Sequence, residues 1–176
     1  MKKYEFTGET KRVELWNRTA TLHRIKATVE FGFVKVGELG GWIEKEENLS
    51  HEGKAWVCGN AKVWGNAKVW GNAKVCGDAK VWGNAKVCGD AKVCGDAEVF
   101  LASHVLVMGS VGSRNDFTTF FRDKDNEITV KCGCFLGKID KFLEKVTQTH
   151  GNNKYALVYR AAVEVAKLQI ELTERK

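Results

Sequence analysis

The chain has 176 residues, 44% of them hydrophobic, and a formal net charge of +6. That length allows one main folded unit with a buried core and attached end segments. Because no run of about 18 apolar residues occurs, we expect neither a membrane span nor a membrane partner. Because the basic excess is spread along the chain, we do not expect a nucleic acid as partner.

The first ten residues, MKKYEFTGET, lack the apolar run of a secretory signal peptide, so we expect a cytoplasmic protein. In that compartment thiols stay reduced, and the six cysteines are interpreted as free thiols. Neither a nucleophile elbow nor a phosphate-binding loop occurs. We therefore expect no cofactor, assign no catalytic residue and favour a non-enzymatic protein.

Residues 1–36 are predicted to form an N-terminal β cap. Lys3–Thr7 and Thr19–Phe31 have strand-forming composition, the second being rich in threonine, valine and isoleucine. The repeats further along the chain predict a solenoid, whose ends expose unpaired backbone groups. A polar β segment is a common way to cover them.

Residues 37–54 are predicted to form an irregular first coil. Three apolar residues lie 18 positions before inward-facing positions of the next coil: Leu39, Ile43 and Leu49. Lys45 and His51 stand where the pattern would place valines. The predicted solenoid therefore covers residues 37–112.

From Ala61 the chain repeats the six-residue unit Ala-Lys-Val-Trp-Gly-Asn, with Cys sometimes replacing Trp and Asp sometimes replacing Asn. Valine returns every six residues from Val57 to Val111. This period does not fit a helix, but it fits short strands with Ala and Val on one side and Lys and Trp on the other. Gly followed by Asn or Asp then makes the turn. Fixed periods of this kind are typical of solenoids.

Three repeats per coil give ordered columns of side chains. With a spacing of 18, the residue after valine falls into three columns: Cys58, Cys76 and Cys94; Trp64, Trp82 and Phe100; Trp70, Cys88 and Leu106. Two repeats per coil would mix Trp and Cys without order. Parallel stacks favour like side chains, so we predict a mainly β protein built on a three-sided parallel solenoid.

Residues 113–176 are predicted to form a small α+β unit after a flexible exit at 109–113. Phe117–Arg122 and Glu127–Cys132 are expected to pair as a hairpin. A helical stripe of Ile139, Phe142, Leu143 and Val146 is expected to stop at Gly151. A second helix, capped by Asn152 or Asn153, is expected from about 154 to 172 with this apolar face: Tyr155, Val158, Tyr159, Ala162, Val165 and Leu168.

The repeats resemble the hexapeptide-repeat left-handed parallel β-helix, in which an aliphatic residue is followed four positions later by a small one, as in Val63 and Ala67. The segments Gly40–Glu44 and Glu46–Ser50, with Val130–Phe135 and His150–Asn153, are similar to a family of phage and prophage proteins. The resemblance implies the left-handed winding and a phage-type protein. It implies no shared activity.

The outer surface of the solenoid carries the candidate ligand site: Lys62, Trp64, Lys80, Trp82 and Phe100. Large aromatics do not line an open surface without a partner. One interpretation is that another subunit, in a trimer or dimer, or the C-terminal helices cover them. The other is that the aromatics contact a base while lysines meet phosphates. Asp78 and Asp90 are expected as counter-charges to the lysines.

The sequence offers two further chemistries. Cys132 and Cys134 could hold half of a zinc site, but His104 and His150 would have to complete it from a distance, so we predict no metal. Hexapeptide solenoids also include acyltransferases with a histidine base, but His104 stands at the solenoid end and is interpreted as a surface residue. The leading hypothesis is an oligomeric protein that binds a nucleotide-like host signal or a host defence protein. The alternatives are an acyltransferase and a purely structural scaffold.

Overall fold

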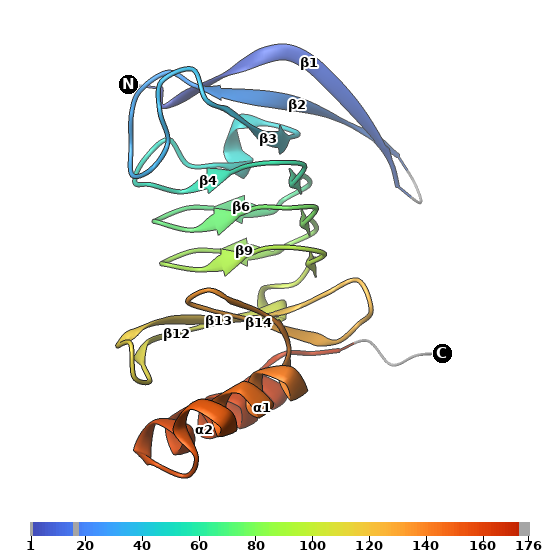
Figure 1. The fold of residues 1–176 in the computed structure, drawn as a ribbon. Coiled ribbons are helices and arrows are strands. Elements are labelled where there is room, and N and C mark those ends of the chain that lie inside the picture. Colours follow the sequence, from blue (N-terminus) through green and yellow to red (C-terminus); the bar gives the residue numbers. More distant parts are fainter. Residues whose placement is uncertain (1, 16–17, 173–176) are drawn as a thin grey trace.

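A computed structural model describes residues 2–15 and 18–172. The molecule is mainly β, and its parts follow one another along one axis (Figure 1). An N-terminal antiparallel sheet lies at one end, a parallel β-solenoid of about three turns lies in the middle (residues 42–99), and an antiparallel sheet with two helices lies at the other end. Residues 1, 16–17 and 173–176, which belong to the predicted end segments, lie outside the described residues.

The N-terminal strands are β1 (Tyr4–Glu14) and β2 (Thr19–Ala27). The strands that follow along the solenoid are β3 (Leu39–Ile43), β4 (Trp56–Val57), β5 (Lys62–Val63), β6 (Lys68–Val69), β7 (Lys74–Val75), β8 (Lys80–Val81), β9 (Lys86–Val87), β10 (Lys92–Val93) and β11 (Glu98–Val99). The C-terminal elements are β12 (Val105–Val111), β13 (Asp116–Arg122), β14 (Ile128–Cys132), β15 (Phe135–Lys138), α1 (Ile139–His150) and α2 (Lys154–Gln169). Two short 3-10 helices are η1 (Glu46–Asn48) and η2 (Ala102–His104).

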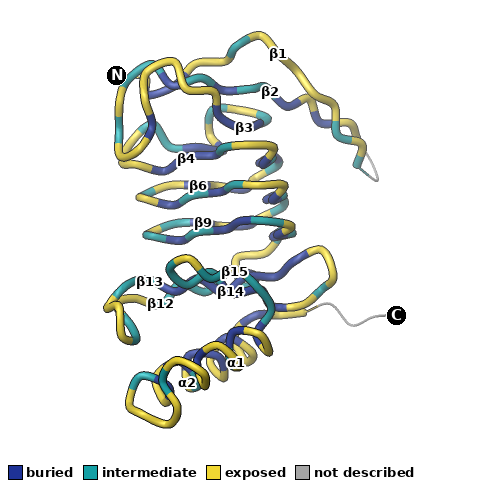
Figure 2. The backbone as a smooth tube through the Cα atoms, viewed as in Figure 1, coloured by how far each residue is buried: buried dark blue, intermediate teal, exposed yellow. Residues whose placement is uncertain are grey.

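The predicted three-sided coil is confirmed by the strand pairing. Val57 pairs with Val75, Val63 with Val81 and Val69 with Val87, each in a parallel ladder. The alanines and valines of the repeats are buried and form the core cluster, whereas the turns are largely exposed (Figure 2). The left-handed sense of winding stays a prediction that rests on the resemblance.

The first coil is longer than predicted. Ile43 pairs with Val63 and Leu49 with Val69, so these residues stack at a spacing of 20 rather than 18. Leu39, predicted to point inward, is 46% exposed and pairs with Lys26 of β2 instead. The prediction was wrong because two extra residues lie between Leu49 and Trp56, where the spacing returns to 18, and the six-residue pattern gives no signal of an insertion.

The predicted N-terminal cap is confirmed, although β1 extends further than expected. Strands β1, β2 and β3 are antiparallel, and β3 continues into the parallel ladder β5–β8–β11, so cap and solenoid share one sheet. The Lys3 ammonium is buried and donates a 2.8 Å hydrogen bond to the Ala55 carbonyl. The Tyr4 hydroxyl donates a 2.8 Å hydrogen bond to the Leu49 carbonyl. These contacts satisfy backbone acceptors at the first coil.

At the other end, the six-residue spacing of valines continues in the sequence beyond the last coil of the solenoid. Val105 and Val111 keep the valine spacing but lie on β12, which pairs antiparallel with β13. The predicted hairpin of β13 and β14 is confirmed, and β12 and β15 complete a four-stranded sheet. This sheet caps the last coil: the Lys92 amide donates to the Thr119 hydroxyl at 3.0 Å, and Arg122 Nη1 donates to the Glu98 carbonyl at 3.0 Å.

The two predicted helices are confirmed, but the buried face of α2 was assigned wrongly. Asn153 caps α2 by accepting from the amides of Tyr155 and Ala156. Its buried residues are Ala156, Tyr159, Ala162, Val163 and Ala166. Three residues predicted to be buried are exposed instead: Val158 (40%), Val165 (45%) and Leu168 (89%). The helix is apolar on two faces, so the sequence pattern could not show which one packs on β12–β15. Within the described residues, neither helix has the length and apolar character to cross a membrane.

Substituting Val75 with Asp should unfold the solenoid. Val75 is fully buried and stacks between Val57 and Val93. Burying an unpaired carboxylate there costs several kcal/mol, which is comparable to the stability of a whole domain. Asn84→Asp is the matched control, because Asn84 is exposed and accepts from Asn66 through an oxygen that Asp retains. Thermal melting by circular dichroism should show a large loss for Val75→Asp alone; equal melting temperatures would contradict the core assignment.

Candidate functional site

Three of the predicted site residues form one continuous column. The ring centroids of Trp64 and Trp82 are 5.2 Å apart with an interplanar angle of 2°, and those of Trp82 and Phe100 are 5.0 Å apart at 31°. The rings stack because β5, β8 and β11 pair in register and each ring follows the paired valine. We refer to Trp64, Trp82 and Phe100 as the aromatic column.

The N-terminal hairpin covers part of this column. Trp64 is only 4% exposed and packs in a cluster with Ala20, Leu22 and Trp42, and Val13 and Leu15 contact the cluster. The hairpin of β1 and β2 bends away from the first coil and runs down beside the solenoid (Figure 1). The expectation that another subunit or the C-terminal helices cover the column was therefore wrong for Trp64. The apolar residues near the end of the hairpin were the signal that the sequence reasoning missed.

The lysines beside the column differ in their partners. Lys62, Lys80 and Glu98 stack on one another through the ladder that carries the column. The Lys80 ammonium lies 2.9 Å from the Glu98 carboxylate, whereas Lys62 forms no ion pair within the described part of the chain. Glu98, rather than an aspartate of the turns, is therefore the counter-charge of Lys80.

The predicted aspartate counter-charges are engaged in the turns. Asp78 accepts a 3.3 Å hydrogen bond from the side-chain amide of Asn60, and Asp90 accepts a 3.1 Å hydrogen bond from the side-chain amide of Asn72. These contacts join turn residues that lie one coil apart. They leave the lysines of the solenoid without the expected aspartate partners, so this part of the prediction was wrong.

A carboxylate takes the aromatic position in the first coil. Because Trp42 pairs with Lys62, the residue that stacks above Trp64 is Glu44. Glu44 accepts a 2.7 Å hydrogen bond from the Gly65 amide and forms a two-pronged ion pair with Arg18. The hydrogen bond from Arg18 lowers the pKa of the Glu44 carboxyl below its ordinary value. An acid–base pair thus closes one end of the aromatic column.

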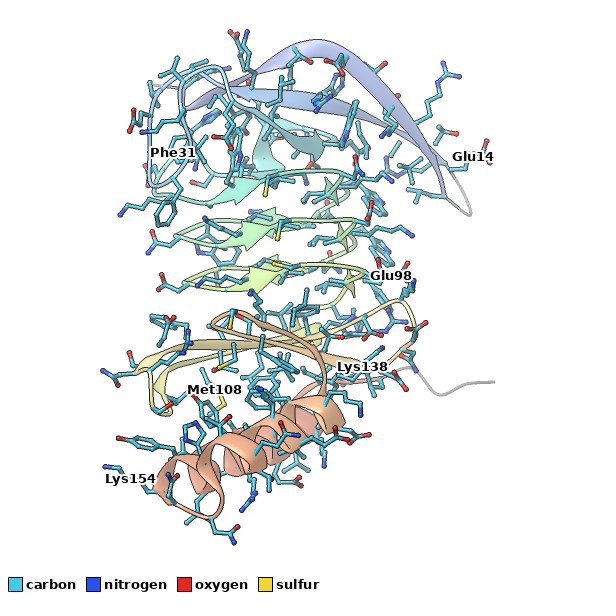
Figure 3. All side chains as sticks on the ribbon, in the orientation of Figure 1. Glu14, Phe31, Glu98, Met108, Lys138 and Lys154 are labelled. Carbon is cyan, nitrogen blue, oxygen red and sulfur yellow. The ribbon has the colours of Figure 1, made fainter. Side chains whose placement is uncertain are left out.

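Two hollows flank the column. The first, of about 370 Å³, lies on the lysine side and is bordered by the hairpin end and by Lys62, Lys80 and Glu98. The second, of about 630 Å³, lies on the turn side and is bordered by Arg18, Lys45 and the Gly-Asn turns. Both are lined by Leu15, Trp64 and Trp82. Glu14 and Glu98 lie on this same side of the molecule (Figure 3). The structure therefore brings together the aromatic rings and lysines that the sequence grouped.

Phe100 is enclosed by two other residues. The Arg122 guanidinium lies 5.0 Å from its ring centroid, and the His104 ring meets it edge-on at 4.3 Å. His104 Nδ1 accepts a 3.3 Å hydrogen bond from the Phe100 amide, and His104 is fully buried rather than on the surface as predicted. Within the described residues its Nε2 has no hydrogen-bond partner. A histidine held in this way is a structural residue and is not accessible as a base for acyl transfer.

The second predicted cluster is partly assembled. Cys132, Cys134 and His150 line one pocket next to Tyr159, whereas His104 is buried beside Phe100. Among the residues that the structure describes, no group of three or more His, Cys, Asp or Glu side chains has the arrangement of a metal site. The geometry thus gives no support to the zinc alternative.

No protein-family model matches the chain, and a search of curated proteins gives no significant match.

Stability should fall at mildly acidic pH because of His104. Burial, together with the charge of Arg122, lowers the pKa of His104 below its ordinary value of 6.5, while Glu171 acts in the opposite direction. The unfolded chain takes up a proton below about pH 6.5, whereas the folded chain resists it until the pH reaches the lowered value, so the free energy of unfolding decreases across that window. Melting temperatures between pH ~7.5 and ~5.5 should fall less in His104→Asn than in the wild type. Parallel curves for the two proteins would contradict this role.

Proposed function

We propose that the protein is a non-enzymatic binding protein whose aromatic column, with the adjoining lysines, takes a flat anionic ligand of the nucleotide class. The observation that carries this proposal is the half-buried Trp82 between two hollows, next to Lys62 and Lys80. The hairpin shields Trp64 but leaves Trp82 partly accessible. A base requires a flat apolar partner and a phosphate requires a cation, and this face offers both.

The geometry restricts how such a ligand can lie. The Trp64 and Trp82 rings are 5.2 Å apart, a separation set by the backbone ladder, and a base inserted between them would need about twice the ~3.5 Å aromatic contact distance. The ligand therefore lies in a hollow and meets the ring edges, an arrangement that aromatic pairs also favour. Lys62, which has no ion-pair partner in the described structure, is the first candidate for the phosphate.

The biological setting of this proposal comes from the resemblance to phage and prophage proteins. A phage accessory protein in the cytoplasm of its host could sequester a nucleotide signal or bind a host defence protein. Of the alternatives, the acyltransferase has less support because His104 is buried. A purely structural scaffold is the hypothesis that remains if neither a ligand nor a partner binds.

We also propose that the protein self-associates, through α2 rather than through the columns of the solenoid. The exposed residues Val158, Ala161, Val165 and Leu168 follow the alternating three and four spacing of a coiled-coil seam. A helix that is apolar on both faces is usually buried on both. A seam with valines at one set of positions, and Ala161 and Leu168 at the other, is closest to the pattern that favours pairs of helices. Of the two expected assemblies, this stripe favours a dimer. A second copy is the occupant that an unpaired seam fits best.

Calorimetry with a panel of cyclic and linear nucleotides tests the ligand proposal. Trp82→Ala should weaken binding by about 1 kcal/mol through loss of the ring contact. Lys62→Ala and Lys80→Ala should weaken it and flatten its salt dependence. Trp70→Ala with Lys68→Ala is the matched control, because these residues adjoin in the same repeat pattern on another face of the solenoid. Equal loss in the control, or tight binding to the Trp82→Ala and Lys80→Ala double variant, would refute the site; no binding to the wild type would refute the ligand class.

Sedimentation velocity tests self-association. The wild type should sediment as a dimer at micromolar concentration, and Val165→Glu with Leu168→Glu should sediment as a folded monomer, because charges on the seam remove its apolar contact. Phe33→Glu is the control, since Phe33 is 85% exposed and lies in the N-terminal segment. A monomeric wild type, or a dimer that survives the double substitution, would show that α2 is not the interface.

A further inference from the structure

The pocket beside Tyr159 lies in the C-terminal unit, away from the aromatic column and its two hollows. It has a volume of about 400 Å³, within the usual range for small-molecule sites, and opens where β14, β15, α1 and α2 meet. Its wall is aromatic: the Phe142 ring meets Tyr159 edge-on at 5.5 Å and lies 5.4 Å from Phe135. The helices pack beneath the sheet at this end of the molecule (Figure 1).

Two cations border this pocket without an acidic partner. Arg114 and Lys145 line it, and neither forms an ion pair or a side-chain hydrogen bond among residues 2–15 and 18–172. The guanidinium of Arg114 lies against the turn at Gly133, where an added Cβ would be 2.7 Å from Nη1 and where φ is +56°. Glycine at this position therefore allows the arginine to lie over the turn and beside the pocket.

Polar groups also line the pocket. The Ser113 hydroxyl and His150 Nε2 are 3.3 Å apart, and the His150 ring stacks on Tyr159 at 5.9 Å. Tyr159 is buried and lies over Gly112, where an added Cβ would be 2.0 Å from the Tyr159 hydroxyl. Burial, with the nearby Cys132, raises the pKa of the Tyr159 phenol, so it stays an O–H donor at neutral pH. The site thus offers hydrogen-bond donors between an apolar wall and two cations.

We propose that this pocket binds a small aromatic anion, with its ring against Phe135, Phe142 and Tyr159 and its anionic group between Arg114 and Lys145. Planar guanidinium groups bind carboxylates and phosphates in a two-pronged manner, and a lysine adds a point charge. An apolar pocket with a few convergent polar groups is the usual form of a small-molecule site. The inference does not rest on the proposed function, because it uses no residue of the aromatic column.

Phenyl phosphate is the probe. Its binding is measured by calorimetry and by the changes that it causes in backbone amide chemical shifts. We expect shifts at residues 113–114, 132–135 and 149–150, and affinity above that of inorganic phosphate or benzyl alcohol, each of which has only half of the required chemistry. Benzoate in place of phenyl phosphate distinguishes a carboxylate from a phosphate preference. Arg114→Gln and Lys145→Gln should each weaken binding about tenfold, as expected for loss of a charge-assisted hydrogen bond.

Two controls keep the test specific. Lys141→Gln removes a cation from the same helix that is paired with Glu144 at 2.9 Å, and it should leave affinity unchanged. Trp82→Ala should also leave it unchanged, so this inference and the proposed function can fail separately. The proposal is overturned if phenyl phosphate does not bind, if its shifts fall on the aromatic column, or if the Arg114→Gln and Lys145→Gln double variant binds as tightly as the wild type.

Discussion

The register of 18 residues between coils is the constraint on which the structure depends. Each coil donates its backbone amides to the next, as Lys62 does to the Ala79 carbonyl at 2.9 Å, so equal repeat positions must stack. The turns permit this only with a residue that tolerates positive φ: Gly77 has φ +70°, and an added Cβ would lie 2.9 Å from the Gly95 amide nitrogen. Because the ladder fixes the backbone, it also sets the separation of equivalent side chains in successive coils. The rings of the aromatic column are therefore stacked by the backbone pairing and not by ring attraction alone.

A parallel ladder leaves unpaired backbone groups at its two ends, and in this protein each end is covered by a different structure. At the first coil, β3 belongs to both the antiparallel N-terminal sheet and the solenoid, so the hairpin of β1 and β2 extends one face. At the last coil, β13 meets the ladder with its own polar groups, through Thr119 and Arg122. Both candidate sites adjoin these end structures. Both hollows beside the aromatic column are bordered by the end of the hairpin, and the C-terminal pocket lies in the unit that follows the last coil.

The regular part of this fold could be predicted from sequence because the six-residue unit repeats many times. Each further repeat supports the same spacing of 18 residues between coils. The ends carry no such redundancy. The two extra residues in the first coil displaced Leu39, and no pattern distinguished an insertion from a substitution. For α2, both faces satisfied the helical period, so only packing could decide that Ala162 faces inward and Leu168 outward. The aromatic column was predicted, but its coverage by the N-terminal hairpin was not. The packing of Trp64 against the hairpin joins parts of the chain that are distant in sequence.

The titratable groups beside the aromatic column bear on the proposal that this is a binding site. General acid–base chemistry needs a titratable group that reaches the reacting atom with a suitable pKa. Beside the column, Glu44 is held ionised by Arg18, Glu98 is paired with Lys80, and His104 is buried. Within the described residues Lys62 forms no ion pair, and Trp82 is partly accessible beside it. For the ligand proposed above, such a preorganised surface would not have to be ordered on binding. The 5.2 Å separation of the Trp64 and Trp82 rings would exclude insertion between them.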